Sequence, residues 1–442
     1  MLKKLIFIFF ISPAFLMAQH TIKGNFSPPE DYNFAVLYKV TPTSSLYITN
    51  TKIDEKGDFK FELDSTLGQG MYKIVYALPQ EEFNFDIIYN AKEDVSFTFN
   101  AETGVNFKAS VENILVNSYT NSMSLISQSI GNFYKQESKD SLALMAIFKT
   151  QKETQIEYEK VAVGTIASNF IKANKPYVPT VHEDITTYIA NLKKHFFDYV
   201  DFNNETLQSS NFLVDRVLNY VFGMSSKEDD EIAIYKRNID EVFKAMKKAP
   251  PEIKSTLLEV IWQQMVDTNF DSVANYISDT YLIKIAESLK DTELVNSLKL
   301  FKRVSIGIKA PEFDVLVDEN GKRTPISLYD LDVAKKYIVV FWSSSCSHCL
   351  EEIPQLQAYL KGLNNQDYKV IAIGLEDDAY QWEKEIAKYP EFMHVLGLGK
   401  WENKIGRSYN ISATPTYFIL DSEKKILAKP YDITTLKEYF EN

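Results

Sequence analysis

The strongest constraint on the fold of this chain is a pair of cysteines at the junction of a strand and a helix. Cys346 and Cys349 are the only cysteines among 442 residues, and two residues separate them. The apolar run 337–342 has the composition of a buried strand, and residues 350–363 show helical periodicity. We therefore expect Cys346 at the N-terminal end of a helix, where backbone N–H groups and the helix dipole stabilise an anion.

That position has a chemical consequence. A helix N-terminus lowers the pKa of a cysteine, and the thiolate rather than the thiol attacks disulfides. Cys349 lies one helical turn after Cys346, close enough to attack a mixed disulfide formed there and to release the partner. The spacing therefore predicts a thiol–disulfide exchange centre.

Three other uses of the C-x-x-C motif were weighed against this one. A structural zinc site needs two more ligands, and His182, His195 and His394 are scattered singly. A purely structural disulfide would close a very small loop, and the stabilisation from a disulfide grows with loop length. Copper binding by the two cysteines and a distant histidine such as His394 stays open.

The N-terminus has the features of an export signal. Lys3 and Lys4 form a basic start, residues 5–17 are an apolar run too short to span a bilayer, and Ala18 is a small residue at the cleavage position. We expect a signal peptide cleaved before Gln19 and a soluble mature protein in the periplasm. An uncleaved N-terminal anchor is the alternative.

The net charge of the mature protein limits the classes of partner that it is expected to bind. Without Lys3 and Lys4, 46 basic residues stand against 60 acidic ones, a formal charge of −14. Such a charge disfavours nucleic-acid and anionic-membrane partners. A single cysteine pair in an exported protein fits an oxidising compartment in which the pair is used for chemistry.

Three regions follow the predicted signal peptide at residues 1–18. Residues 19–110 contain seven short β-rich runs separated by turn signals, which predicts an all-β sandwich of unknown role. Residues 111–302 switch to helical periodicity and predict an α-helical region. Residues 303–442 alternate between strands and helices, which predicts an α/β domain with a central β-α-β unit and a terminal β-hairpin.

The expected elements can be stated residue by residue. The strands of the β region are expected at 21–26, 34–40, 46–53, 58–63, 71–77, 83–88 and 95–100. The strands of the α/β domain are expected at 313–317, 337–342, 368–374, 416–420 and 425–428, and its helices at 347–363, 379–389, 401–409 and 433–440.

The C-terminal 140 or so residues carry several motifs that occur together in one superfamily. They are the opening segment 307–313, the pair Phe341-Trp342, the cysteine motif, the run 352–354 and the segment 413–421. On these motifs residues 303–442 resemble the thioredoxin superfamily, particularly the reductase-like branch that includes ResA and TlpA. The Asp-x-x-Gly-x-Phe-x-Phe turn at 54–61 is similar to the β domain that often precedes such domains in Gram-negative bacteria. The helical stretch 195–220 is similar to a segment of the same architectures.

The resemblance implies roles for individual residues. Cys346 would be the attacking cysteine and Cys349 the resolving one. Thr414 and Pro415 match a cis-proline loop that binds an extended substrate, and Trp342 joins them in the implied substrate-binding set. A cis X–Pro bond is uncommon, so this expectation rests on the resemblance alone.

Glu352 is the implied proton acceptor for the resolving cysteine. It follows Cys349 by three residues and so lies on the same helical face. Thioredoxins proper place a buried aspartate two residues before the tryptophan, and this chain has Val340 there, which favours Glu352 in that role. A solvated glutamate is the alternative, and the neighbouring Glu351 is the natural control.

Two departures from the family pattern bear on the direction of electron flow. Ser345 stands where the family usually has a tryptophan, and Ser347-His348 replaces the usual dipeptide between the cysteines. If His348 stabilises the thiolate, the reduced form is favoured and the disulfide becomes a stronger oxidant. The family architecture therefore favours a reductase. The Ser347-His348 dipeptide between the cysteines favours an oxidase or isomerase.

The expected function is an exported thiol–disulfide oxidoreductase that acts on cysteine-containing envelope proteins. No organic cofactor and no metal is required, and a membrane thiol–disulfide partner would recycle the cysteine pair. A binding or scaffold protein with a vestigial thioredoxin domain and a copper-handling protein are the alternatives.

Overall fold

The computed structural model describes residues 20–42, 44–64, 66–80, 82–224, 230–319, 322–362 and 367–441. The predicted signal peptide and Gln19 lie outside the described residues. The chain divides into two compact units, one that ends at Leu257 and one that begins at Leu258. The predicted boundary between residues 302 and 303 does not coincide with this division, because the last helices before it belong to the second unit.

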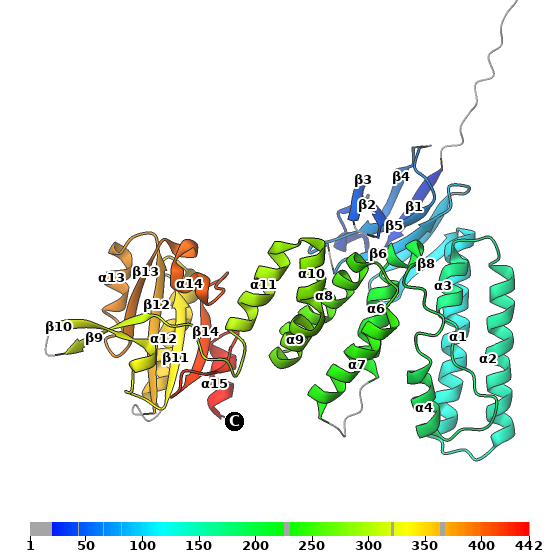
Figure 1. The fold of residues 1–442 in the computed structure, drawn as a ribbon. Coiled ribbons are helices and arrows are strands. Elements are labelled where there is room, and N and C mark those ends of the chain that lie inside the picture. Colours follow the sequence, from blue (N-terminus) through cyan, green and yellow to red (C-terminus); the bar gives the residue numbers. More distant parts are fainter. Residues whose placement is uncertain are drawn as a thin grey trace, which may run out of the picture. The chain divides into compact units, whose positions relative to one another are not determined.

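The first unit begins with the predicted β-sandwich, which consists of two four-stranded sheets (Figure 1). Their orders are β4-β1-β7-β8 and β3-β2-β5-β6. The strands are β1 (Thr21–Phe26), β2 (Phe34–Thr41), β3 (Ser44–Lys52), β4 (Asp58–Glu62), β5 (Gly70–Val75), β6 (Asn84–Tyr89), β7 (Val95–Asn100) and β8 (Gly104–Ala109). The sequence analysis missed β8, whose apolar alternation is limited to Val105 and Phe107 and which pairs antiparallel with β7.

Aromatic side chains fill the space between the two sheets. Phe26 lies among them, with its ring centroid 4.9 Å from that of Phe59 and 5.0 Å from that of Phe99. Strand β4 alternates exposed and buried residues, as expected for a strand with one face on a core. The sandwich is thus held by the inward faces that the alternating pattern predicted.

Helices complete the first unit. They are α1 (Val111–Lys135), α2 (Ser141–Val161), α3 (Ala167–Ala173), α4 (Ile185–Lys194), α5 (Glu205–Gln208), α6 (Phe212–Leu218), the π-helical turn η2 (Asn219–Gly223) and α7 (Glu231–Ala245). Helices α2 and α3 are separate, and Gly164 adopts a positive φ of 82° between them. Helix α8 (Pro251–Asp267) crosses the boundary between the units.

The second unit continues with α9 (Asp271–Ile277), the π-helical turn η3 (Ser278–Leu282), α10 (Ile283–Leu289) and α11 (Thr292–Arg303). The α/β domain that follows has a five-stranded sheet in the order β13-β12-β11-β14-β15. Strands β11, β12 and β13 are parallel, and β14 and β15 are antiparallel to their neighbours. This arrangement confirms the predicted α/β fold class with its central β-α-β unit and terminal hairpin.

The elements of this domain are β9 (Asp314–Glu319), β10 (Lys322–Ser327), β11 (Lys336–Trp342), α12 (Ser347–Lys361), β12 (Tyr368–Glu376), α13 (Tyr380–Ile386), β13 (Met393–Leu398), α14 (Lys404–Ser408), β14 (Thr416–Asp421), β15 (Ile426–Ala428) and α15 (Ile433–Glu441). The sequence analysis missed β10 and β13. Strand β10 contains Pro325 and pairs with β9 in a two-stranded ribbon, an arrangement that tolerates a proline.

Strand β11 is the centre of this domain. Alternate side chains point to opposite faces, with Val339 and Phe341 in one core and Ile338, Val340 and Trp342 in the other. The second core also contains residues of α12 and α15, which cover that face of the sheet (Figure 1). A strand that is buried on both sides cannot slip in register, so the residues that follow it are held in place.

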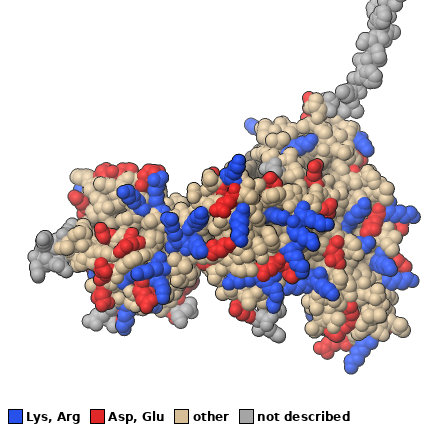
Figure 2. All heavy atoms as spheres, in the orientation of Figure 1, with Lys and Arg blue, Asp and Glu red and all other residues tan. Residues whose placement is uncertain are grey.

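Acidic and basic side chains are intermixed over the face of the molecule in Figure 2. The excess of acidic residues is therefore spread among lysines and arginines on that face. Within the described residues, no helix has both the length and the apolar character needed to cross a bilayer.

Candidate active site

The cysteine pair lies where the sequence placed it, at the start of α12. Cys346 is the N-cap residue with extended backbone angles, and its sulfur accepts a hydrogen bond from the backbone N–H of Cys349 at 3.3 Å. The backbone N–H of Cys346 donates to the carbonyl of Ser343 at 3.1 Å. A sulfur that accepts from the first turn of a helix is placed to carry a negative charge.

The surroundings of Cys346 favour its thiolate. Partial burial by itself raises the pKa of the thiol, but hydrogen bonds from the side chain and backbone of Cys349, from Thr414 and from the backbone of His348 outweigh it. The net result is a pKa of Cys346 below the ordinary value for a cysteine. Both cysteines are present as free thiols.

The surroundings of Cys349 have the opposite effect and favour its protonated thiol. Its side chain is fully buried, and this burial together with its hydrogen bond to Cys346 raises the pKa of Cys349 to about 12. At neutral pH the pair therefore consists of one reactive sulfur at the surface and one protonated sulfur beneath it. This asymmetry is what an attacking and a resolving cysteine require.

The cis-proline loop is present as the resemblance implied. The Thr414–Pro415 peptide bond is cis, and both residues are half-buried. The thiol of Cys346 donates to the carbonyl oxygen of Thr414 at 3.3 Å. The loop before β14 therefore lies directly against the attacking sulfur.

Glu352 is held by two donors. Its Oε2 atom accepts a hydrogen bond from the hydroxyl of Tyr417 at 3.0 Å and another from the backbone N–H of Ile433 at 3.0 Å. Burial and the neighbouring Glu352 and Cys349 raise the pKa of Tyr417. Tyr417 and Cys349 belong to the same buried core. Glu351, by contrast, is exposed.

The sequence analysis missed a second carboxylate, Glu376, at the carboxyl end of β12. It is 5% exposed, and it accepts hydrogen bonds from the backbone N–H of Ser344 and from the hydroxyl of Ser343. The Ser343 hydroxyl in turn lies 3.0 Å from that of Ser345. Glu376 thus fixes the loop between β11 and Cys346. An acidic residue at the end of the strand next to β11 was the available signal.

His348 and Ser345 lie at the surface beside the cysteine pair. The side chain of His348 is exposed, and its interaction with Cys346 comes from the backbone N–H. Ser345 is also exposed, where the family usually has a tryptophan. The surface around the attacking sulfur is therefore small and polar on this side.

The side chain of Trp342, which the resemblance implied to bind substrate, does not lie at the surface. Trp342 is 0% exposed and lies in the core formed by β11, α12 and α15. The pleat of β11 turns this side chain inward, so it supports the cysteine pair from below and does not reach a substrate.

A metal site would require several ligand side chains in one cluster. No group of three or more His, Cys, Asp or Glu side chains that could hold a metal ion occurs in the part of the chain that is described. The ring of His394 meets the carbonyl of Tyr389 at 2.8 Å, and the ring of His195 meets Asp198 at 2.6 Å. His182 is exposed.

Known proteins resemble the C-terminal part of this chain. Residues 306–429 match the model of the AhpC/TSA family, and these residues form an AhpC/TSA domain with a thioredoxin-like fold. The thiol-disulfide oxidoreductase ResA of Bacillus cereus is 26% identical over 128 residues, which are 29% of this chain and 70% of that protein. The thiol:disulfide interchange protein HelX of Rhodobacter capsulatus is 27% identical over 28% of this chain and 66% of its own length.

Solved structures give similar matches. The thioredoxin domain of a thiol-disulfide oxidoreductase from Bacteroides vulgatus is 26% identical, with a TM-score of 0.27, over 31% of this chain and 99% of that domain. A thioredoxin-like protein from Bacteroides caccae is 20% identical, with a TM-score of 0.34, over 60% of this chain and 96% of that protein.

The opposite pKa shifts of the two cysteines predict selective alkylation of the reduced protein. The pKa of Cys346 is lowered, so its thiolate persists at pH values at which an ordinary thiol, with a pKa of about 8.5, is mostly protonated. Iodoacetamide should therefore modify Cys346 alone from acidic to mildly alkaline pH, as read by peptide mass spectrometry. In guanidinium chloride both cysteines should react with the pH profile of free cysteine. Equal reaction of both cysteines in the folded protein would contradict this assignment.

Proposed function

We propose that this protein is an exported thiol–disulfide oxidoreductase that exchanges disulfides with the cysteines of other envelope proteins. The observation that supports it most is the asymmetry of the pair, a half-buried Cys346 with a lowered pKa above a buried Cys349 with a raised one. A membrane thiol–disulfide partner would return the pair to its starting redox state. The names of the relatives agree with this chemistry.

The proposed reduction runs in two steps. The Cys346 thiolate attacks one sulfur of a substrate disulfide, so a mixed disulfide forms and the other substrate sulfur leaves as a thiolate that takes up a proton. Cys349 then loses its proton and attacks Cys346, which forms the Cys346–Cys349 disulfide and frees the second substrate thiol. Two electrons pass from the protein to the substrate. The reverse sequence oxidises a substrate dithiol, and the reduction potential of the pair decides which direction prevails.

The second step needs a proton acceptor because Cys349 is protonated at neutral pH. Glu352 is the proposed acceptor, since its carboxylate reaches the neighbourhood of Cys349 through the hydroxyl of Tyr417. The backbone N–H of His348 is proposed to stabilise the thiolate of Cys346 in the first step.

Thr414 and Pro415 are proposed to bind the substrate. Their cis peptide lies against the attacking sulfur, through the Thr414 carbonyl that accepts from Cys346. A segment of substrate that lies along this loop would bring its disulfide to Cys346. The exposed Ser345 leaves room beside the sulfur for a bulky partner.

The chemistry is tested by separate replacement of the two cysteines. Cys346→Ser should abolish the acceleration that the protein gives to insulin reduction by dithiothreitol, because no attacking sulfur remains. Cys349→Ser should accumulate mixed disulfides with substrate proteins, visible on non-reducing gels, because nothing releases them. The parent protein and Ser347→Ala, which keeps both sulfurs, serve as controls. Undiminished turnover by Cys346→Ser would rule out the proposal.

Replacement of Glu352 tests the proposed proton transfer. Glu352→Gln should slow release of the mixed disulfide by about 10²-fold or more near neutral pH, the range typical of a lost general base. Attack by Cys346 should change little, because Glu352 is not among the groups that lower the pKa of Cys346. Stopped-flow kinetics separates the two steps. Glu351→Gln is the matched control, since that side chain is exposed, and identical release rates for the two variants would assign the proton transfer to water.

Export is tested on the intact protein. Residues 1–18 carry the features of a signal peptide, so the protein from a periplasmic extract should begin at Gln19. Intact-mass measurement of the soluble and membrane fractions reads this directly. Membrane-bound protein that still carries Met1 or Leu2 would support an N-terminal anchor instead.

A further inference from the structure

The donor that holds Glu352 comes from the beginning of the last helix. Ile433, whose N–H donates to Oε2 of Glu352, is the first residue of α15, and the chain reaches it from β15 through residues 429–432. The other donor, Tyr417, is fully buried within β14. The position of the short connection 429–432 therefore decides whether the backbone donor meets the carboxylate.

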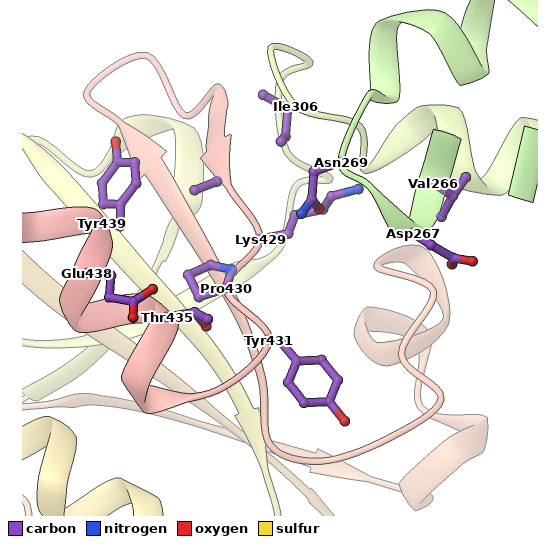
Figure 3. Close-up of a pocket in the computed structure, with 11 residues that line it drawn as sticks. Val266, Asp267, Asn269, Ile306, Lys429, Pro430, Tyr431, Thr435, Glu438 and Tyr439 are labelled. Carbon is purple, nitrogen blue, oxygen red and sulfur yellow. The ribbon is translucent and has the colours of Figure 1, made fainter. Parts of the chain in front are cut away.

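Residues of this connection line one wall of a cavity of about 700 Å³ in the second unit, seen in Figure 3. Pro430 in the connection is buried. Lys429, Pro430 and Tyr431 line the cavity opposite the end of α8 and the turn after it, which contribute Val266, Asp267 and Asn269. Tyr431 is 88% exposed. At its C-terminal end the connection is fixed by the cap of α15, where Oδ1 of Asp432 accepts from the backbone N–H of Thr435 at 2.8 Å. At its N-terminal end a different interaction holds it.

An ion pair supplies that interaction. The ammonium group of Lys429 lies 2.6 Å from Oδ2 of Asp271, the first residue of α9, which is 2% exposed. The same oxygen accepts from the backbone N–H of Ile306 at 2.8 Å. The Lys429 ammonium also lies 4.8 Å above the ring of Phe301 in α11. Because either charge would be costly to leave buried without the other, the pair holds Lys429 firmly against α9 and α11.

We propose that Asp271 and Lys429 are positioning residues, through which helices α9 and α11 hold the first turn of α15 in place so that it supports Glu352. The inference rests on the proposed role of Glu352 and adds to it a function for the helices that precede the thioredoxin-like domain. Three residues separate Lys429 from Ile433, so a shift of Lys429 is passed on within a single short segment. Without the pair, the Ile433 N–H leaves the carboxylate, and proton transfer from Cys349 slows.

The experiment uses the full-length protein with the double substitution Asp271→Asn/Lys429→Met. This variant removes both charges, leaves none buried without a partner, and keeps an oxygen at residue 271 for the N–H of Ile306. Stopped-flow kinetics should show release of the mixed disulfide slowed by about three- to tenfold, with attack by Cys346 unchanged within about twofold. Circular dichroism verifies that the variant is folded, and the single variant Lys429→Met gives a second measurement.

A double-mutant cycle distinguishes positioning from a general loss of structure. If the pair acts through Glu352, the substitutions should have no further effect on release in a Glu352→Gln background. Lys302→Met is the matched control, because Lys302 forms a 2.7 Å ion pair with Asp279 in the same unit but both side chains are about half exposed. Its release rate should equal that of the parent.

Several outcomes would overturn the inference. Equal slowing of attack and release, an unchanged release rate, or a full additional effect in the Glu352→Gln background would each show that the pair does not act through Glu352. If Glu352→Gln itself leaves release unchanged, the positioning role fails together with the proton-acceptor role, while the cysteine chemistry stands. Loss of turnover in Cys346→Ser is independent of all these results and tests the proposed function alone.

Discussion

The hydrogen bond from the backbone N–H of Cys349 to the sulfur of Cys346 is the interaction on which the rest of the site depends. It exists because β11 is buried on both faces and ends directly before α12, so the first turn of the helix meets the sulfur at a fixed place. One cysteine then gains donors for its thiolate, and the other is buried in the core beneath it. A difference in pKa between two chemically identical groups follows from position alone.

Two glutamates extend this arrangement into the body of the domain. Glu376 holds the loop before Cys346 from below, and Glu352 meets Tyr417 and the start of α15 beside Cys349. Each carboxylate accepts hydrogen bonds from backbone N–H groups, which offset the cost of its partial burial. The ion pair of Asp271 and Lys429 extends the same network to the helices before the domain. The short segment from Lys429 to Ile433 then links Asp271 on α9 to Glu352 beside Cys349.

Most of the fold could be predicted because its elements have strong local signals. The alternation in β4 and the apolar run of β11 predicted strands that the structure confirms. The missed strand β10 contains Pro325, and a proline weakens the local signal of a strand. Trp342 was assigned to the substrate from a family motif, and a motif does not show that both faces of β11 are covered.

The sequence by itself determined the position of the cysteine pair: two cysteines at this spacing, after a buried strand and before a helix, predict thiol–disulfide exchange from local pattern alone. It also indicated Glu352, because helical spacing relates that residue to Cys349. Only the tertiary structure decided which other groups touch the pair. Glu376 is about 30 residues from the cysteines and Lys429 about 80. Sheet pairing and helix packing bring them into the network, and such long-range contacts follow from the burial of whole elements and leave no local pattern.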